Sequence, residues 1–265
     1  AACPVGNDIV RFIQKITQED FEGAWNLIKE ENPFPGICGR VCFHPCESKC
    51  NRGDYDEPIA IHALERFVSD FASNLSKKIE KSPGVRKGKV AIIGSGPAGM
   101  SCAYHLAKLH YDVNVFESSS SSGGMLRSGI PSYRLPKDVL DREISNIEAL
   151  GVEIRTGIRL GENLTWDDLK DYQAIFIATG VHRSRGLHIP GEKTRRVLSG
   201  LDLLRKINSG KKLKLGDKIA IIGGGNTAID VARSILRLGK KATILYRRSK
   251  EEMPAFEDEM AEAME

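Results

Sequence analysis

The sequence lacks several features that would point to a membrane, an export route or a nucleic acid. No apolar run approaches the ~20 residues that a bilayer span needs, and the N-terminus has no signal-peptide pattern. We therefore expect a cytoplasmic protein without a membrane span. The 39 basic and 35 acidic residues leave a formal net charge of only +4, which argues against a nucleic-acid partner. Among the six histidines no Ser/His/Asp, Cys/His or paired-carboxylate constellation stands out, so no catalytic side chain is predicted.

Length and composition are those of a globular protein. The chain has 265 residues, 41% apolar and 28% charged, which is enough for two domains and a smaller third part. We expect an α/β protein with an all-α N-terminal part, followed by two Rossmann-like βαβ nucleotide-binding domains of which the second is incomplete. The expected boundaries are 1–80, 81–210 and 211–265, with a charged linker over 76–88.

The first glycine-rich turn lies between two predicted strands, in the stretch 89–117. Four apolar residues lead into Gly94-Ser95-Gly96-Pro97-Ala98-Gly99, a helical pattern follows, and the second strand ends at Glu117. Gly94 allows a sharp turn, Gly96 leaves room for a pyrophosphate, and Gly99 allows close packing of the helix. The helix N-terminus favours the phosphates, and Glu117 is placed to bind both hydroxyls of a ribose. A glycine turn without a ligand is the alternative, but the full pattern predicts a dinucleotide site.

A second nucleotide motif begins at Lys218. A strand over 219–222 runs into Gly223-Gly224-Gly225-Asn226-Thr227-Ala228, a helix extends to Leu238, and the next strand, 242–246, ends in Arg247-Arg248 instead of an acid. Two guanidinium groups at this position suit the 2′-phosphate of NADP, which a carboxylate would repel. A solvated arginine pair is the alternative interpretation.

Five of the six cysteines lie in the first fifty residues. Cys38, Cys42, Cys46 and Cys50 repeat at C-x3-C spacing, and Cys3 precedes a proline. Without an export signal, disulfides are disfavoured and a metal is favoured. Zinc ligands usually come in separated pairs, whereas an iron–sulfur cluster accepts a crowded thiolate run. An iron–sulfur cluster is therefore favoured over zinc or structural thiols. The sixth cysteine, Cys102, is expected in the core.

The remaining segments predict helices in the first eighty residues and mixed structure afterwards. Thr17-Gln18-Glu19-Asp20 resembles a capping box, a helix follows until Pro33 and Pro35, and then the cysteine loop begins. Pro58 is predicted to open another helix, with a buried stripe at Leu64, Phe67, Val68, Phe71 and Leu75. Later elements are a helix over 137–150, a strand over 152–155 and a buried parallel strand over 174–177 that runs into Ala178-Thr179-Gly180.

Taken together, these motifs resemble a known family, that of the NADPH-linked flavoprotein small subunit of glutamate synthase and the N-terminal half of dihydropyrimidine dehydrogenase. The motifs that carry the resemblance are CPVGNDI, CGRVCFHPCESKC, GSGPAG, GGMLRSGIPSYRLP, ATG, GGGNTAIDVAR and YRRSKEEMPA. The resemblance implies FAD at the first turn, NADPH at the second and two [4Fe-4S] clusters in the cysteine domain. It implies an oxidoreductase that passes electrons between these cofactors and a partner subunit or domain.

The resemblance also implies site residues. For one cluster the matching ligands are Cys3, Cys42, Cys46 and Glu65. Cys50 matches a ligand of the other cluster, whose remaining cysteines lie upstream of the Cys-Pro step in the family, and Cys38 matches none. For FAD the matches are Val41, Gly96, Pro97, Ala98, Gly99, Met100, Glu117, Gly123, Gly124, Met125, Arg134 and Leu160; for NADPH they are Gly225, Asn226, Thr227, Ala228, Arg247 and Arg248. Gly94, Thr179, Gly180 and Gly223 complete the candidate cofactor-binding residues as parts of the turns.

The implied reaction follows from the cofactors. NADPH gives two electrons as hydride and a cluster takes one at a time, so a flavin is needed between them. The family's later Gly-Asp segment over the flavin is not in this sequence, and we expect either a fragment or completion by another chain. A second hypothesis is a non-catalytic FAD and iron–sulfur relay or assembly subunit that does not turn over NADPH. The final electron acceptor and the direction of electron flow stay open.

Overall fold

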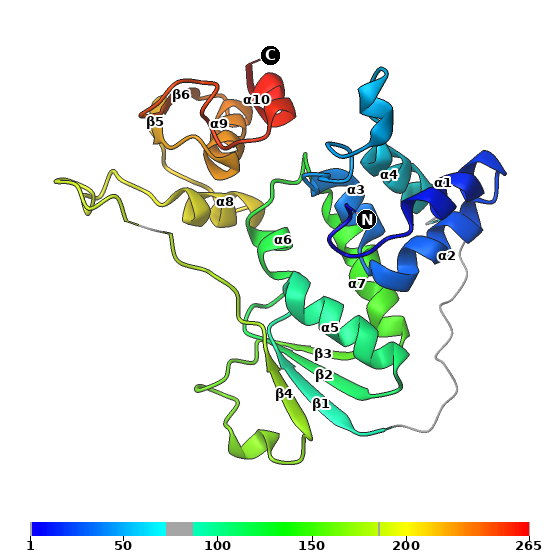
Figure 1. Ribbon diagram of the computed structural model, residues 1–265. Coiled ribbons are helices and arrows are strands. Elements are labelled where there is room, and N and C mark those ends of the chain that lie inside the picture. The colour runs from blue at the N-terminus through cyan, green and yellow to red at the C-terminus, as the bar shows by residue number, and fades with distance from the viewer. Residues whose placement is uncertain (1, 73–86, 185, 265) are drawn as a thin grey trace. The chain divides into compact units, whose positions relative to one another are not determined.

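The computed structural model describes residues 2–72, 87–184 and 186–264. These residues form two compact units (Figure 1). The first consists of Ala1–Leu126 and Arg134–Gly180, and the second of Arg127–Tyr133 and Val181–Glu265. Most of the linker predicted over 76–88 lies outside the described residues.

The first unit begins with helices, as predicted. Among the described residues before 87 there is no strand. The helices are α1 (Ile9–Thr17), α2 (Phe21–Glu31), α3 (Pro35–Val41), the 3-10 turn η1 (Asn51–Asp54) and α4 (Ile61–Ala72). Their apolar faces meet in a core of Phe12, Ala24, Ile28, Ile61 and Val68. This small core leaves the cysteine-rich segment, 42–50, on its border.

Three details of the helical prediction are wrong. The capping box at Thr17 is not formed, because α1 extends to Thr17 and Asp20 caps α2 by accepting the N–H of Gly23 at 2.9 Å. Pro35 does not lead into a loop but opens α3, since proline is compatible with the first turn of a helix. The next helix, α4, begins three residues after Pro58, at Ile61.

The predicted stripe of α4 is buried only in part. Val68 is fully buried, but Phe67 and Phe71 are 47% and 38% exposed, and Leu75 lies outside the described residues. The two exposed rings pack edge-on against Phe21 of α2 instead of reaching the core. The helix therefore presents a narrower apolar face than its sequence predicted.

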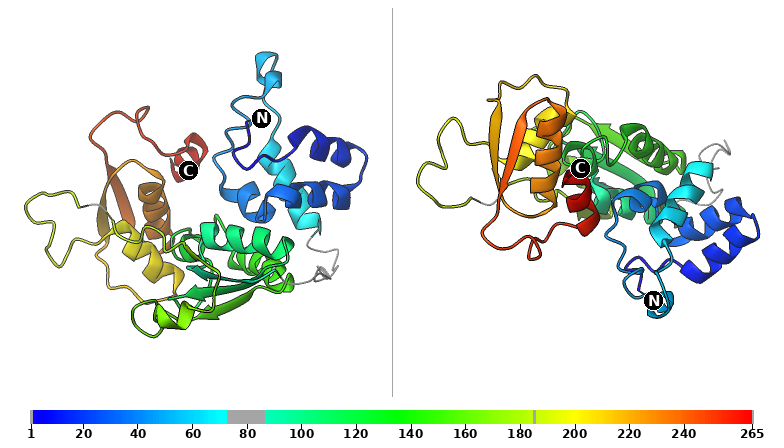
Figure 2. Two further views of the ribbon diagram at one scale, coloured as in Figure 1. Left: turned by 60° about the horizontal axis from the view of Figure 1, so that its bottom comes forward. Right: turned by 90° about the horizontal axis from the view of Figure 1, so that it is seen from above.

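The rest of the first unit is built on a four-stranded parallel sheet with the order β3-β2-β1-β4. Along the chain its elements are β1 (Lys89–Ile93), α5 (Pro97–Lys108), β2 (Asp112–Glu117), α6 (Gly124–Ser128), α7 (Lys137–Ala149), β3 (Glu153–Thr156), the 3-10 turn η2 (Asp167–Leu169) and β4 (Ala174–Ile177). Ile92 of β1 lies between Val115 of β2 and Phe176 of β4. Helix α5 covers one face of the sheet, which Figure 2 shows from further directions.

β4 differs from the prediction in its burial. It is parallel, as expected, but it is an edge strand, and Ile177 is 58% exposed. A continuous apolar run in an α/β protein predicts burial on both faces, and the edge position removes one set of neighbours. The expectation of a buried strand was therefore wrong for β4.

The second unit contains a βαβ arrangement around a smaller sheet. Its elements are α8 (Gly200–Asn208), β5 (Lys218–Ile222), α9 (Asn226–Arg237), β6 (Lys241–Leu245) and α10 (Glu257–Met264). β5 and β6 pair in parallel, with Ile221 beside Ile244. Ile235 of α9 and Leu204 of α8 lie in the buried core of this unit. None of the helices within the described ranges is long and apolar enough to span a membrane.

Candidate cofactor and cluster sites

The first glycine turn joins β1 to α5 as predicted. Gly94 has φ of +110°, in the region that favours glycine, and its N–H donates to the carbonyl of Phe116 at 2.8 Å. A Cβ on Gly99 would collide with the carbonyl oxygen of Gly94, so the helix can start only because this residue is glycine. A Cβ on Gly96 would instead meet no protein atom within 4 Å. The turn is therefore open on the side of Gly96, at the N-terminus of α5, where a phosphate would be stabilised.

The predicted glycine pair lies directly against this turn. The N–H of Gly123 donates to the carbonyl and to Oγ of Ser95, each at 3.1 Å. Gly124 has φ of +52°, and a Cβ on it would lie 2.7 Å from Cα of Gly96. The structure thus brings the two segments together as backbone against backbone, which is the arrangement that close approach to a dinucleotide requires.

Glu117 ends β2 as predicted, but it is already engaged by protein donors. It is 6% exposed, and its Oε2 accepts the N–H and the hydroxyl of Ser95 at 2.9 and 2.6 Å. Its Oε1 accepts the N–H of Ser119 at 2.7 Å and the hydroxyl of Ser118 at 3.3 Å. Burial raises the pKa of Glu117, and these hydrogen bonds, led by the Ser95 hydroxyl, lower it by more, so the pKa falls below its usual range. No sequence motif predicted this role for Ser95.

The other residues predicted at the FAD site lie in different surroundings. Met100 is fully buried on α5, whereas Thr179 and Gly180 follow β4 and are exposed. Leu160 is half-buried and packs against a core cluster that includes Phe116 and Leu164. Met125 and Arg134 are half-buried, as is Val41 at the end of α3. Their contact with FAD stays a prediction.

The second glycine turn joins β5 to α9 and is covered by a later segment. Gly223 has φ of +137°, and Gly225 forms the N-cap of α9. The carbonyl of Gly224 accepts the N–H of Ala255 at 3.1 Å, and Oδ1 of Asn226 accepts the N–H of Phe256 at 3.0 Å. Asn226, predicted to bind NADPH, therefore also fixes the Met253-Pro254-Ala255 segment over the turn. Thr227 and Ala228 lie in the first turn of α9.

The predicted phosphate-binding arginines follow β6 directly. Arg247 and Arg248 are both exposed, after Tyr246. Arg248 lies 3.9 Å from Glu252, a distance at which an exposed ion pair is weak. Both guanidinium groups are therefore accessible to an anionic ligand, as the NADPH prediction requires.

Three of the five clustered cysteines lie near one another. Cys42 caps the C-terminus of α3, and burial raises its pKa, with negative charge on Glu65 and Cys3 adding to the effect. For Cys46, burial first and then nearby Glu47 and Cys3 raise the pKa to about 11. Such thiols become thiolates when a metal centre supplies positive charge. Electrostatic interactions thus connect Cys3, Cys42 and Cys46, and their role as ligands of one cluster stays a prediction.

Cys50 and Cys38 lie in different electrostatic surroundings. Hydrogen bonds from the backbone of Ile59 and then of Arg52 lower the pKa of Cys50. Burial raises the pKa of Cys38 to about 12, and its thiol faces Oδ1 of Asn32 at 3.7 Å. Both residues are partly exposed, and the thiol of Cys50 is the more acidic of the two. The place of Cys50 in a second cluster stays a prediction.

Glu65 is more buried than the sequence predicted. It was expected to be half-buried at most, but it is 7% exposed on α4. Its Oε1 accepts hydrogen bonds from the side-chain amides of Asn32, at 2.8 Å, and Asn7, at 3.3 Å. Burial raises its pKa to about 7. Oδ1 of Asn7 is itself buried and has no hydrogen-bond partner among the residues that the structure describes.

The donor set fits a polynuclear cluster better than a single zinc ion. Zinc holds sulfur ligands at ~2.3 Å, so their sulfurs lie at most ~4.6 Å apart. Among the described residues, one group of possible metal ligands has all its donor atoms within 4.8 Å of one another. It consists of His44, Glu47 and His62 and contains no cysteine. Three spaced thiols and a buried carboxylate beside an unpartnered amide oxygen fit an iron–sulfur cluster.

A group of three residues, His44, Glu47 and His62, connects the cysteine loop to α4. Oε1 of Glu47 accepts the N–H of His62 and lies 2.8 Å from its Nδ1. The rings of His44 and His62 stack with centroids 4.3 Å apart, and Nδ1 of His44 lies 3.0 Å from the carbonyl of Cys42. These contacts hold the backbone between Cys42 and Cys46 in place.

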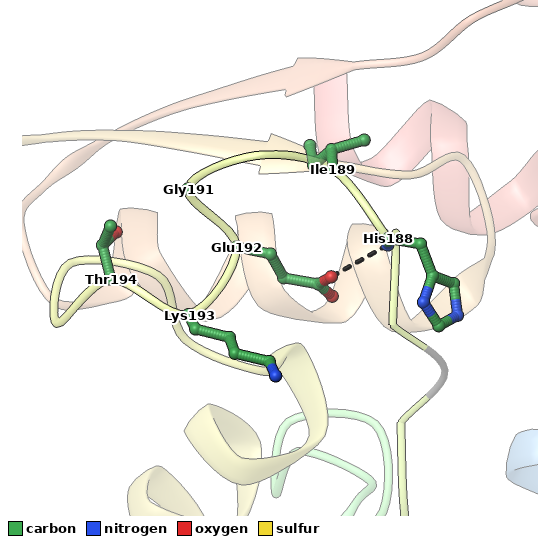
Figure 3. Close-up of a pocket in the computed structure, with 6 residues that line it drawn as sticks. All are labelled: His188, Ile189, Gly191, Glu192, Lys193 and Thr194. Atoms are coloured by element: carbon green, nitrogen blue, oxygen red, sulfur yellow. Dashed lines mark hydrogen bonds between the residues drawn. The ribbon is translucent and has the colours of Figure 1, made fainter.

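A surface hollow in the second unit contains none of the predicted residues. It has a volume of about 470 Å³ and is lined by His188, Ile189, Gly191, Glu192, Lys193 and Thr194 (Figure 3). The carboxylate of Glu192 turns inwards and accepts the N–H groups of Leu187 and His188 at 2.6 and 2.8 Å. The hollow thus lies within a single loop that closes around Glu192.

Comparison with known families agrees with this arrangement of turns and cysteines. Two glycine turns at helix N-termini, each between parallel strands, define a dinucleotide-dependent oxidoreductase. Residues 88–265 match the family described as "Pyridine nucleotide-disulphide oxidoreductase", and residues 1–77 match "Dihydropyrimidine dehydrogenase domain II, 4Fe-4S cluster". The chain belongs to the pyridine nucleotide-disulphide oxidoreductase family and carries this iron–sulfur domain at its N-terminus. The predicted fold class, the enzyme class and the use of FAD, a pyridine nucleotide and a [4Fe-4S] cluster are confirmed.

Curated relatives match nearly all of this chain. The NADP(+)-dependent formate dehydrogenase subunit beta of Moorella thermoacetica is 42% identical over 98% of this chain and 41% of its own length. The NADPH-Fe(3+) oxidoreductase subunit beta of Geobacter sulfurreducens is 40% identical, over 96% and 39%. The NAD-dependent dihydropyrimidine dehydrogenase subunit PreT of Escherichia coli O157:H7 is 39% identical, over 100% and 65%. The chain thus spans about two fifths of the first two relatives.

Solved structures show the same fold. FprA of Mycobacterium tuberculosis in complex with NADPH superposes with a TM-score of 0.59 at 24% identity, covering 68% of this chain and 47% of that one. A 2-naphthoyl-CoA reductase complex superposes with a TM-score of 0.56 at 25% identity, covering 77% and 28%. These similarities confirm the α/β dinucleotide-binding architecture.

Proposed function

We propose that this chain is the NADPH-oxidising part of an electron-transfer enzyme, in which electrons pass from NADPH through FAD and a [4Fe-4S] cluster to a partner subunit or domain. The observation that carries the proposal is that one compact unit contains both the open glycine turn of the FAD type and the grouped cysteines. The cofactors supply the chemistry, since a flavin exchanges hydride with a nicotinamide and single electrons with a cluster. The three domains are proposed to be 1–80, 81–210 and 211–265.

The residues of the chain bind and orient these groups. The turn from Gly94 to Gly99 would hold the FAD pyrophosphate at the N-terminus of α5. Glu117 is kept ionised by its hydrogen bonds, two of which come from the rotatable hydroxyls of Ser95 and Ser118. Ribose hydroxyls are donors of the same kind and would take these positions. Cys3, Cys42, Cys46 and Glu65 would hold one cluster.

NADPH is favoured over NADH by the chain itself. The names of the relatives divide, because two refer to NADP(H) and one to NAD. The proposal therefore rests on Arg247 and Arg248, which are exposed directly after β6, where the 2′-phosphate of NADPH would lie. Two arginines are suited to bidentate recognition of a phosphate.

A partner and a compartment follow from two further observations. The relatives are named as beta subunits or as subunit PreT, which supports a partner that exchanges electrons with the cluster. An iron–sulfur domain needs reduced cysteines as ligands, which supports a reducing compartment such as the cytoplasm.

An anaerobic absorption spectrum before and after addition of NADPH tests the proposal. We expect bleaching of the flavin band near ~450 nm, followed by loss of the broad cluster absorption, because hydride reaches the flavin first. Dithionite serves as the control reductant. Bleaching by dithionite but not by NADPH or NADH would show instead a relay that does not turn over pyridine nucleotide.

A further inference from the structure

A buried carboxylate connects the FAD-binding sheet region to the cysteine domain. Glu143 lies on α7, and its side chain is 2% exposed. Its Oε1 accepts the N–H of Gly36, in the first turn of α3, at 2.7 Å. Its Oε2 lies 3.7 Å from Nζ of Lys29, on α2. One side chain therefore contacts two helices of the cysteine domain.

Lys29 is held at the same contact by groups from both parts. Its side chain is 6% exposed, and Nζ donates to the carbonyl of Pro33 at 2.8 Å. The ammonium group lies 4.9 Å from the ring centroid of Tyr104, on α5. The hydroxyl of Tyr104 in turn donates to the carbonyl of Lys29. The ion pair is thus enclosed between α2 and α3 on one side and α5 and α7 on the other.

α3 transmits this contact to the predicted cluster ligands. Gly36 lies in the first turn of the helix, and Cys42 caps its other end six residues later. Within α3, a Cβ on Gly39 would lie only 2.6 Å from the backbone N of Arg66, so the helix packs backbone to backbone against α4. Arg66 follows Glu65 in sequence. A contact that fixes the start of α3 therefore also fixes Cys42 and Glu65.

The chemistry of the contact indicates that it positions α3 and does not mainly increase the stability of the fold. A buried ion pair rarely stabilises a protein more than an apolar pair of the same size would, because both charges lose their hydration. A directional N–H···O bond to the first turn of a helix, however, allows one position along the helix axis, whereas an apolar contact allows sliding. The contact of Glu143 with Gly36 and Lys29 is therefore suited to fixing the distance between α7 and α3.

We propose that Glu143 is a positioning residue that fixes the cluster-binding segment α3–Cys42 against the FAD-binding sheet through Gly36 and Lys29, and so sets the rate of electron transfer between flavin and cluster. The inference rests on the proposed function. Glu143 belongs to neither the predicted ligands nor the glycine turns. Its charge also acts on Glu65, so Gly36→Ala, which keeps that charge, is the variant that isolates the effect through α3.

Two variants and one matched control test the proposal in the anaerobic holoprotein. In Gly36→Ala, the new Cβ would lie 2.8 Å from Oε1 of Glu143 and from Oγ of Ser69, which forces the contact apart without changing a charge. Glu143→Gln keeps an acceptor for Gly36 but removes the charge that faces Lys29. Gly53→Ala is the control, because its Cβ would first meet Pro58 at an ordinary 3.4 Å in the cysteine loop.

The measurements separate placement from folding. Stopped-flow absorption follows flavin reduction by NADPH, freeze-quench EPR follows cluster reduction, and iron content and both midpoint potentials are determined for each variant. In Gly36→Ala we expect wild-type flavin reduction, iron content and potentials, with slower cluster reduction. In Glu143→Gln we expect a smaller loss of rate together with a shift of the cluster potential, because the charge of Glu143 acts on Glu65. Gly53→Ala should match the wild type in all of them.

Other outcomes overturn the inference in distinguishable ways. An unchanged rate of cluster reduction in both variants, with normal iron content, shows that the contact does not set this step. A rate that falls only in proportion to lost iron shows a merely structural role. Failure of the wild type to reduce its cluster with NADPH would refute the proposed function itself, and the inference with it. Glu143→Gln remains informative if Gly36→Ala fails to assemble its cluster.

Discussion

The side-chain amide of Asn32 donates to Oε1 of Glu65 over 2.8 Å, and the amide of Asn7 approaches the same oxygen at 3.3 Å. Both amides bind the same oxygen, so Oε2 is the atom that the prediction assigns to the cluster. Outer contacts of this kind orient a metal ligand and are commonly as important as the ligand itself. Asn7 follows Cys3 by four residues, so the two predicted ligands Cys3 and Glu65 are tied together in space.

Glu65 is the predicted ligand that substitution tests most directly. A carboxylate is a harder donor than a thiolate, so Glu65→Cys should keep the cluster and shift its potential. Glu65→Ala should leave one iron open and favour loss to a three-iron form, measured by EPR and iron content. Cys38→Ser is the control, since this buried thiol is not a predicted ligand. A four-iron signal in Glu65→Ala identical to that of the wild type would assign the fourth ligand to Cys38 or Cys50.

Metal content tests the cluster itself. For one [4Fe-4S] cluster we expect about four iron and four sulfide per chain, and serine at Cys42 or Cys46 should lower both. Serine at Cys50 should leave this cluster in place, because Cys50 lies in a separate environment. One zinc per chain without sulfide would contradict the electron-transfer function.

The arginine pair predicts the choice of nucleotide. Replacing Arg247 and Arg248 by glutamine should weaken binding of NADPH by ~1.5–3 kcal/mol for each lost charge-assisted contact, and should change NADH binding little. The matched control is glutamine at Arg195 and Arg196, an adjacent exposed pair in the same unit. Titrations followed by flavin absorption or fluorescence measure both affinities. Equal losses for NADPH and NADH would show that the pair does not bind the 2′-phosphate.

The lowered pKa of Glu117 predicts that the stability of the folded protein depends on pH. Its pKa is lowered below 4.5 in the folded state, so its contribution is complete above about pH 4.5 and is lost as the pH falls through the folded value. Ser95→Ala removes the strongest lowering contact and should cost ~1.5–3 kcal/mol of unfolding free energy at pH 7. The difference from the wild type should shrink below about pH 4.5, in urea unfolding of the FAD-free protein followed by tryptophan fluorescence.

Ser118→Ala provides the comparison for that measurement. Its hydroxyl lies 3.3 Å from Glu117, compared with 2.6 Å for the hydroxyl of Ser95, so the loss should be smaller. A difference between Ser95→Ala and the wild type that stays constant down to pH 4 would show that the serine acts through packing and not through the charge of Glu117.

The sequence predicted those parts of the fold that depend on local pattern. Both nucleotide turns were predicted at the correct residues, because Gly94 and Gly223 follow two apolar strands. Pro35 was misinterpreted, because a proline that ends one helix can equally begin the next. The exposure of β4 depends on its order in the sheet, which sequence does not contain.

The parts of the site that were missed depend on contacts between distant residues. Asn7 and Asn32 bury Glu65 from positions 58 and 33 residues away, so a helical pattern alone placed it near the surface. Glu143 binds Gly36 across 107 residues, and no motif marks either of them. The grouping of Cys3 with Cys42 came from the resemblance, since spacing alone would have included Cys38.

The glycines in and beside the first turn are required for different reasons. Alanine at Gly99 or Gly124 would collide with the backbone at Gly94 or Gly96, whereas alanine at Gly96 would project into open space. In a mutational scan, the first two substitutions should therefore remove the folded protein, and Gly96→Ala should yield folded protein that is isolated without its yellow colour. A library screened for both abundance and colour would thus distinguish the glycines that the chain needs in order to fold from the one that only the flavin nucleotide requires.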